Sequence, residues 1–234
     1  MLKFNKIYKE YSMPILGPLT IDIKKNSFVS ILGSSGAGKS TLLRLASNII
    51  KPSSGSVEYL NNDKPKIGFV FQDPTLLPWR SVIDNVTLPS ELTSKNNKLS
   101  RENARFWLSR VGLGGKENSL PNQFETIVGE NGIRLSGGQK QRINLARALA
   151  ASPEVLLCDE VISALDSIVG ANVIELLKRL RKKTGVSFVF ISHDLSTVAS
   201  FADEIVVLYA GRVVEQGHVE QVLSPPDPPD PRLL

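Results

Sequence analysis

The stretch FVSILGSSGAGKST, residues 28 to 41, decides the fold class of this chain. Its first five residues have the composition of a buried strand, and GSSGAGKS matches the pattern G-x-x-x-x-G-K-[S/T]. A helical pattern follows, so the glycine-rich turn lies where backbone N–H groups and a helix N-terminus can surround phosphates. A chance glycine turn is the alternative. We expect the nucleotide to be contacted by Gly33, Ser34, Ser35, Gly36, Ala37, Gly38, Lys39, Ser40 and Thr41.

Within this loop, chemistry assigns two side chains. Lys39 is expected to reach the β and γ phosphates, and the hydroxyl of Ser40 is expected to bind Mg²⁺. The stretch EVLLCDE, residues 154 to 160, is a second chemical signal, because it predicts a buried strand that ends in carboxylates. Asp159 is expected to hold Mg²⁺, and Glu160 to polarise the water that attacks the γ-phosphate. A surface acidic pair at a strand end is the alternative.

Composition allows one large α/β domain with a smaller subdomain in 234 residues. The net charge is +5, but the basic residues are dispersed, so charge selects no partner. The single cysteine, Cys158, lies in an apolar run and is expected to be a buried, inert thiol, as suits a reducing cytosol. No signal peptide and no run of about eighteen apolar residues is present, which predicts a soluble chain.

Patterning along the chain predicts a β-rich opening over residues 1–32, a helix over 40–50 and a strand over 67–71. Residues 74–132 change to helical stretches broken by loops. Strands over 155–157, 187–191 and 205–209 then alternate with helices, including 140–150 and 169–183, which predicts a parallel sheet. We expect an α/β core of residues 1–73 and 133–223, a helical subdomain over 74–132 and a proline-rich tail over 224–234.

Further motifs follow in a fixed order: Gln72 in VFQDP, LSGGQKQR from Leu135, VLLCDE, SALD from Ser163 to Asp166, and His193 in ISHD. With GSSGAGKST, they make nearly the whole chain resemble the ATP-binding subunit of an ATP-binding cassette (ABC) transporter. The resemblance implies a P-loop ATPase with an N-terminal antiparallel β layer, a mostly parallel core sheet flanked by helices, and a helical subdomain. It also implies ATP hydrolysis with ATP and Mg²⁺ as cofactors.

The same resemblance assigns single residues. Gln72 matches the lid glutamine, which contacts the metal and the attacking water, and His193 matches the switch histidine at the γ-phosphate. An aromatic ring that stacks on adenine should precede the phosphate loop by a little over twenty residues, as Tyr11 does. Tyr8 is the second candidate, and a packing tyrosine is the alternative for both.

LSGGQ, residues 135 to 139, has the glycines of a phosphate site but lacks its lysine. In the family, this signature closes over the γ-phosphate bound by a partner subunit, which implies that Ser136, Gly137, Gly138 and Gln139 act on the partner's ATP. An ordinary helix N-cap at Ser136 is compatible with that role.

The implied partners are transmembrane permease subunits, a second copy or a homologous ATPase, and an extracytoplasmic solute-binding protein, on the cytoplasmic side of the cell membrane. No nucleic acid is expected. The apolar run Leu76 to Trp79 either docks a permease helix or packs inward, and Trp107 is expected in the core. A soluble cassette ATPase of DNA repair or translation would carry a coiled-coil insert or a second cassette. A GTPase or kinase would not explain LSGGQ.

Departures from the family leave the solute open. Val161 replaces the proline that often follows the glutamate, which changes the stiffness of that loop. VFQDPTLLPWRSVIDNV resembles nitrate, sulfonate and taurine importers, whereas CDEVISALD and the stretch from FISHD onward resemble di- and oligopeptide importers.

Overall fold

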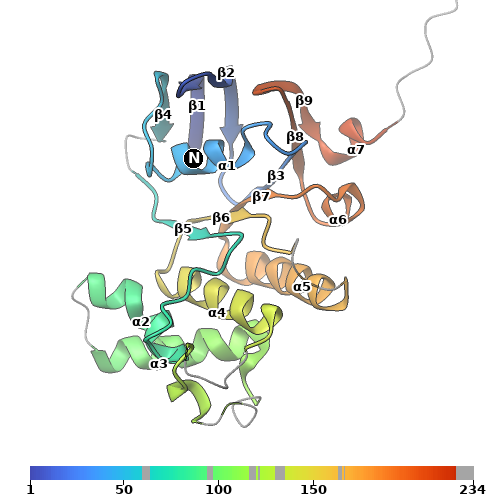
Figure 1. Cartoon of the computed structure of the whole chain (residues 1–234). Helices are drawn as coiled ribbons and strands as arrows, with labels where there is room; N and C mark the ends of the chain where they lie inside the picture. The colour runs from blue at the N-terminus through green and yellow to red at the C-terminus, as the bar shows by residue number, and fades with distance from the viewer. Residues whose placement is uncertain are drawn as a thin grey trace, which may run out of the picture.

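The computed structural model describes residues 1–59, 64–93, 97–115, 120, 122–129, 135–162, 165 and 167–224, without the side chains of Asn97, Lys98 and Val169. A small sheet, a larger sheet and a group of helices form successive layers (Figure 1). None of the helices in these residues is both long enough and apolar enough to cross a membrane. Residues 225–234, which are most of the expected proline-rich tail, lie outside the described part.

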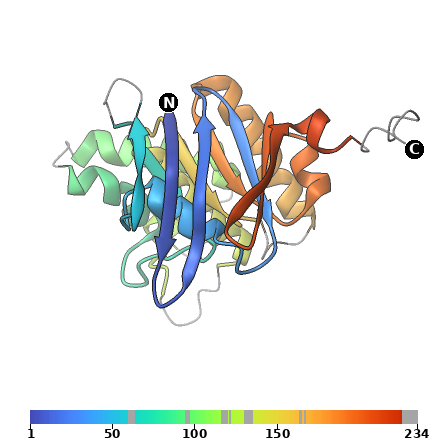
Figure 2. The ribbon, with the colours of Figure 1, turned by 90° about the horizontal axis from the view of Figure 1, so that it is seen from above.

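The small sheet is antiparallel, with the order β2-β1-β4. Its strands are β1 (Leu2–Glu10), β2 (Pro14–Ile23) and β4 (Ser54–Tyr59). Seen from above, β4, β1 and β2 lie side by side over α1 (Lys39–Ala46) (Figure 2). This confirms the expected antiparallel β layer.

The large sheet has the order β5-β6-β7-β3-β8-β9. Its strands are β3 (Phe28–Gly33), β5 (Ile67–Val70), β6 (Val155–Asp159), β7 (Ser187–Ile191), β8 (Glu204–Tyr209) and β9 (Arg212–His218). The strands from β5 to β8 are parallel and β9 runs antiparallel at the edge, which confirms the mostly parallel core sheet.

Successive side chains of the parallel strands point to opposite faces of the sheet, so the apolar residues form one cluster on each face. Val29, Ile31 and the matching residues of β6, β7 and β8 face the small sheet and α1. Phe28, Phe188 and Phe190 face the opposite way, toward the helices. Both faces of the sheet are therefore covered, as parallel sheets require. Cys158 is buried in the second cluster, and burial raises the pKa of its thiol, so it is inert as expected.

The helices packed on the large sheet are α1, α4 (Gly137–Ala150), α5 (Ser167–Thr184), α6 (Leu195–Ala199) and α7 (Val219–Val222). The first helix is shorter than the expected 40–50, because Ser47 caps it and Asn48 takes a left-handed φ of 61°. The fourth begins earlier than the expected residue 140. There Ser136 and Gln139 form a capping box that starts the helix at the glycines.

The region expected to be a helical subdomain contains α2 (Val82–Leu92), α3 (Asn97–Leu108), a π-helical turn (Ser109–Leu113) and a 3₁₀ turn (Gln123–Glu125). Val82, Ile83, Ala104 and Leu108 are buried in the same cluster as residues of α4. The boundaries 74 and 132 remain a proposal. Figure 1 shows α2 and α3 beside α4, on the side of that helix away from the small sheet.

The aromatic cluster under the large sheet generates a stability prediction. The fully buried Phe188 ring stacks on Phe28, with ring centroids 4.9 Å apart. Phe188→Ala should lower the free energy of unfolding by about 3–5 kcal/mol, because it leaves a cavity. The matched control, Phe106→Ala, changes a ring that is 48% exposed and should cost roughly 1 kcal/mol or less. Equal losses in urea unfolding of the two variants would contradict this account of the core.

Candidate functional site

The order of the large sheet brings the expected site residues together. Gln72 follows β5, Asp159 and Glu160 end and follow β6, His193 follows β7, and the phosphate loop follows β3. Because β5, β6, β7 and β3 are adjacent and parallel, their carboxyl ends lie along one edge. Residues that are far apart in the sequence therefore meet at that edge.

The phosphate loop depends on glycines at tight positions. Gly36 and Gly38 take left-handed φ angles of 78° and 93°. A Cβ at Gly38 would lie 2.5 Å from Leu16 Cδ2, so the start of β2 passes directly over the loop. Ser34, Ser35 and Gly36 are exposed, whereas Ala37 is buried. Ser40 and Thr41 lie in the first turn of α1 and are half-buried.

Lys39 points into the loop and is only 7% exposed. Its Nζ donates hydrogen bonds to the carbonyl oxygens of Gly33 and Ser34, each at 2.9 Å. The same Nζ lies 3.8 Å from Glu160 Oε1. The Lys39 ammonium group therefore lies between the carbonyl oxygens of the loop and the Glu160 carboxylate.

The acidic residues differ in their surroundings. Asp159 is 6% exposed, and burial raises the pKa of its carboxyl group, an effect opposed by the hydrogen bond that Ser40 Oγ donates to Asp159 Oδ1 at 3.0 Å. Glu160 is more exposed and accepts a hydrogen bond from Gln72 Nε2 at 3.3 Å. Its φ of 45° is left-handed, a strained conformation that clusters at functional sites.

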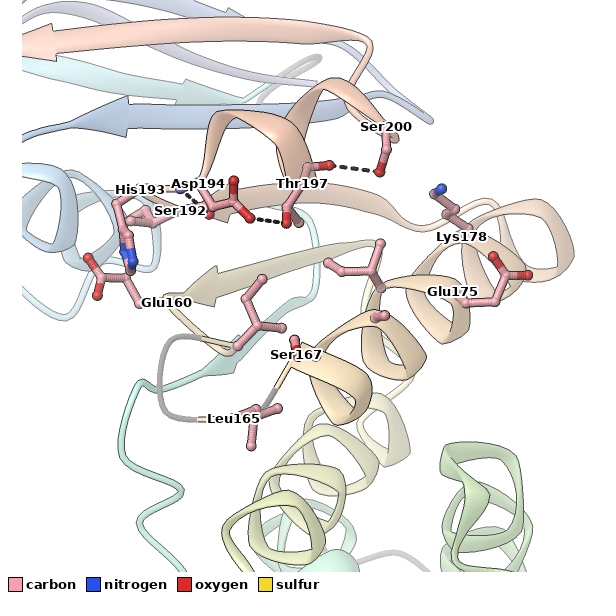
Figure 3. A pocket seen from close by; sticks show the side chains of 15 residues that line it. Glu160, Leu165, Ser167, Glu175, Lys178, Ser192, His193, Asp194, Thr197 and Ser200 are labelled. Atoms are coloured by element: carbon pink, nitrogen blue, oxygen red, sulfur yellow. Dashed lines mark hydrogen bonds between the residues drawn. The ribbon is translucent and has the colours of Figure 1, made fainter.

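Glu160 and His193 line one cavity of 390 Å³ between the end of the sheet, α5 and α6. In Figure 3 the imidazole of His193 lies beside the Glu160 carboxylate, and Asp194 and Thr197 lie to the right of His193. Asp194 caps α6 and accepts hydrogen bonds from Ser196 and Thr197, which lower its pKa to about 2. That cap holds the segment that follows His193.

Sequence reasoning missed the α5 wall of this cavity. Ser167, Ala171, Ile174 and Lys178 line it and are spaced as one helical face. That spacing was the available signal, but it is also the spacing of an ordinary amphipathic helix. Of the SALD motif, Leu165 lines the cavity, whereas Ser163, Ala164 and Asp166 lie outside the described residues.

Tyr11 lies in the turn between β1 and β2 and is 58% exposed. Lys9 Nζ lies 4.8 Å from the centroid of its ring. Tyr8 is half-buried, and its hydroxyl donates to Glu10 Oε2 at 2.8 Å, which raises the tyrosine pKa. Tyr11 therefore offers a more accessible ring than Tyr8 does.

The signature motif lies at the N-terminus of α4. Ser136 Oγ accepts a hydrogen bond from the Gln139 backbone N–H at 3.2 Å, and Gln139 Oε1 accepts one from the Ser136 N–H at 2.8 Å. Ser136 and Gly137 are exposed. Among the described residues, those lining the Glu160–His193 cavity include none from this motif. The motif therefore caps α4, and its residues do not line that cavity.

The residues of the apolar run from Leu76 to Trp79 differ in how exposed their side chains are. Trp79 is 71% exposed, so it does not pack inward, whereas Leu76 packs against the core. Trp107 is half-buried against the same core, as expected.

Comparison with known proteins identifies relatives. The family model described as ABC transporter matches residues 16–163. The methionine import ATP-binding proteins of Staphylococcus haemolyticus and Haemophilus influenzae are 35% and 37% identical to this chain. The matches cover 97% of this chain and 68% and 67% of those proteins.

Solved structures agree. The dimeric ATP-binding cassette MJ0796 in a post-hydrolysis state, bound to ADP and Pi, aligns with a TM-score of 0.78 at 32% identity, over 94% of this chain and 99% of that one. A bacterial Atm1-family ABC exporter with ATP bound aligns with a TM-score of 0.81 at 30% identity, over 95% of this chain and 39% of that one. This chain belongs to the ABC transporter family, as an ATP-binding and ATP-hydrolysing subunit.

Proposed function

We propose that this chain powers solute import, as a peripheral ATPase subunit on the cytoplasmic side of the cell membrane. The curated relatives are named import proteins, whereas an exporter shares the fold, so the direction of transport rests on the relatives. The observation that carries the proposal is the separation of two half-sites. The phosphate loop and acidic pair meet at one edge of the sheet, and the signature caps a different helix.

In this proposal ATP binds along the loop from Gly33 to Thr41, with adenine on Tyr11. The exposed ring and the passage of β2 over Gly38 support this position for the base. Lys39 exchanges its carbonyl partners for the β and γ phosphates, since ammonium–phosphate hydrogen bonds are stronger than those to neutral carbonyls.

Mg²⁺ fits the donor set formed by Ser40, Gln72 and Asp159. Mg²⁺ prefers oxygen ligands and is usually held by one or two carboxylates plus substrate phosphates. The Ser40 hydroxyl and the Asp159 carboxylate are already within hydrogen-bonding distance of each other, and Gln72 comes from the adjacent strand. Bound there, the ion would neutralise charge on the phosphates.

Hydrolysis in this scheme uses Glu160 as the base. Glu160 accepts a proton from the attacking water, Gln72 orients that water, and His193 contacts the γ-phosphate. The Gln72–Glu160 hydrogen bond and the shared cavity of Glu160 and His193 support this division of roles. Lys39 stabilises the negative charge on the phosphates throughout.

The catalytic unit in this proposal is a dimer, with a second copy or a homologous ATPase. Ser136, Gly137, Gly138 and Gln139 of one subunit close over the γ-phosphate of the other. Solved dimers of a similar cassette support this arrangement. Two bound ATP molecules hold the dimer closed, and hydrolysis reopens it.

Permease subunits and an extracytoplasmic solute-binding protein complete the proposed system, and nucleic acid has no part in it. The exposed Trp79 supports permease contact at the loop that follows Gln72. The permease and binding protein select the solute, so methionine, named for the relatives, is the first solute to test. Stimulation of ATP hydrolysis by methionine in the reconstituted complex would be the readout. The relatives give no support to the repair or translation alternative.

Asp159 provides a prediction with opposite effects on stability and activity. Burial raises the pKa of Asp159 in the folded state, because the buried site favours the neutral carboxyl group over the ionised one. The contribution of this group to the free energy of unfolding is therefore fully present below the pKa of the unfolded state, and it is lost as the pH rises through the pKa of the folded state. At neutral pH, Asp159→Asn should therefore raise Tm, with a smaller gain at acidic pH. It should also abolish Mg²⁺-dependent hydrolysis. The control, Asp22→Asn at an exposed site, should change neither. An unchanged or lower Tm at neutral pH would contradict this account.

The shared site is tested through Glu160 and Ser136. Glu160→Gln should preserve ATP binding but slow turnover by roughly 10²–10⁴-fold, because it removes the base. This variant should accumulate as an ATP-dependent dimer in sizing chromatography. Adding Ser136→Arg should abolish the dimer without weakening ATP binding to the monomer.

A mixing experiment completes this test. Pairing Ser136→Arg chains with Lys39→Ala chains leaves one composite site with both motifs intact, so some activity should return. Wild-type hydrolysis by Ser136→Arg alone would mean that the signature is only a helix cap.

A further inference from the structure

One face of α4 carries polar side chains at regular spacing, all directed at the lid loop, residues 71–80. Gln141 and Asn144 are buried, and both donate through their amide nitrogens to the Phe71 carbonyl oxygen, at 3.3 and 3.2 Å. Phe71 directly precedes Gln72. The helix therefore holds the backbone that positions the lid glutamine.

Arg147 extends this face to the next part of the loop. Its Nη1 donates to the Thr75 carbonyl at 2.9 Å, and its Nη2 donates to the Pro74 carbonyl at 2.9 Å and to Thr75 Oγ1 at 3.0 Å. Nη2 also donates to Asn144 Oδ1 at 2.9 Å, and burial lowers the guanidinium pKa. These acceptors are all neutral, and most belong to the loop. Displacing the loop would leave the partly buried guanidinium without its acceptors on Pro74 and Thr75.

Thr75 itself is strained. Its φ of 44° lies in the left-handed region, where a β-branched residue is an outlier. Such a conformation persists only where its surroundings hold it. The hydrogen bonds from Arg147 to both the carbonyl and the hydroxyl of Thr75 supply that hold.

Helix α4 and the lid loop together connect the signature motif with Gln72 and Trp79. Ser136 and Gln139 cap the N-terminus of α4. The lid loop begins next to Gln72, which bonds Glu160, and continues to the exposed Trp79. Asn85 extends the connection to α2, because its amide exchanges hydrogen bonds with the Leu77 backbone N–H and carbonyl.

We propose that Gln141, Asn144 and Arg147 form a clamp that makes the lid loop and the signature motif move as one unit. When the signature closes over the partner's ATP, the clamp carries the movement to Gln72 in the chain's own site and to the surface around Trp79. These are positioning residues, and the inference rests on the proposed dimeric function.

Trp79 can report this movement. In a Trp107→Phe, Glu160→Gln chain it is the only tryptophan, and acrylamide quenching measures its exposure with and without ATP and Mg²⁺. ATP should change the quenching constant as the dimer forms. Adding Arg147→Met should remove that change and weaken ATP-dependent dimerisation about tenfold or more, the effect of losing charged hydrogen bonds. ATP binding to the monomer should be unaffected.

The control is Arg142→Met on the same helix. Arg142 donates to the carbonyls of Val111 and Gly112 and not to the lid loop, so its variant should keep the Trp79 response. Thr75→Pro changes an exposed loop residue and fixes φ near −65°, which is incompatible with the left-handed conformation that Arg147 holds, so this variant should reduce the response even if Arg147→Met fails to fold. Circular dichroism would establish folding of each chain.

The outcomes separate the two proposals. If the reference chain forms no dimer with ATP, the proposed function fails. If it forms the dimer but Trp79 does not respond, or if both Arg147→Met and Thr75→Pro respond like Arg142→Met, the clamp is overturned and the dimeric function stands.

Discussion

Burial of both faces of the large parallel sheet is the constraint on which the rest of this structure depends. Its strands bury one apolar set against the small sheet and α1 and another against the helices, so the faces have no room for polar chemistry. Polar groups can gather only where the strands end. The phosphate loop, the acidic pair, Gln72 and His193 all follow strands at the same edge. A covered sheet therefore both stabilises the chain and determines where the proposed ATP site lies.

Several features at the same edge lower the stability of the folded chain, and burial of the core must offset them. Asp159 is buried in a position that raises its pKa, and Glu160 and Thr75 hold left-handed backbone conformations. A carboxylate near phosphates must be ionised to bind Mg²⁺, although its burial favours the neutral acid. Lys39 and the hydroxyl of Ser40 reduce that conflict by supplying a positive charge and a hydrogen bond. In the proposed Mg²⁺ site, function and stability therefore oppose each other at Asp159.

Much of this arrangement could be predicted because its signals are local. The β7 strand lies at the expected residues 187–191, and the glycine-rich turn lies between a strand and a helix as its motif requires. The expected strands did not include β4 and β9, because their mostly exposed residues lack a continuous apolar pattern. The polar face of α4 was also missed. Gln141, Asn144 and Arg147 bind backbone atoms of a segment about seventy residues earlier in the chain, a pairing that no local pattern encodes.

The hydrogen bonding at Ser136 supports the proposal that the signature serves another subunit. Gln139 and Ser136 satisfy each other's N–H groups, but the amides of Gly137 and Gly138 belong to the first turn, where a helix has no internal acceptor for them. No acidic residue occupies that turn, so no side chain there balances the positive end of the helix dipole. An anion from outside can do so. The chain's own phosphate loop already has the N-terminus of α1, whereas α4 contributes no residue to the lining of the Glu160–His193 cavity. In the proposed dimer, the N-terminus of α1 in one chain and that of α4 in the other therefore hold the same phosphate.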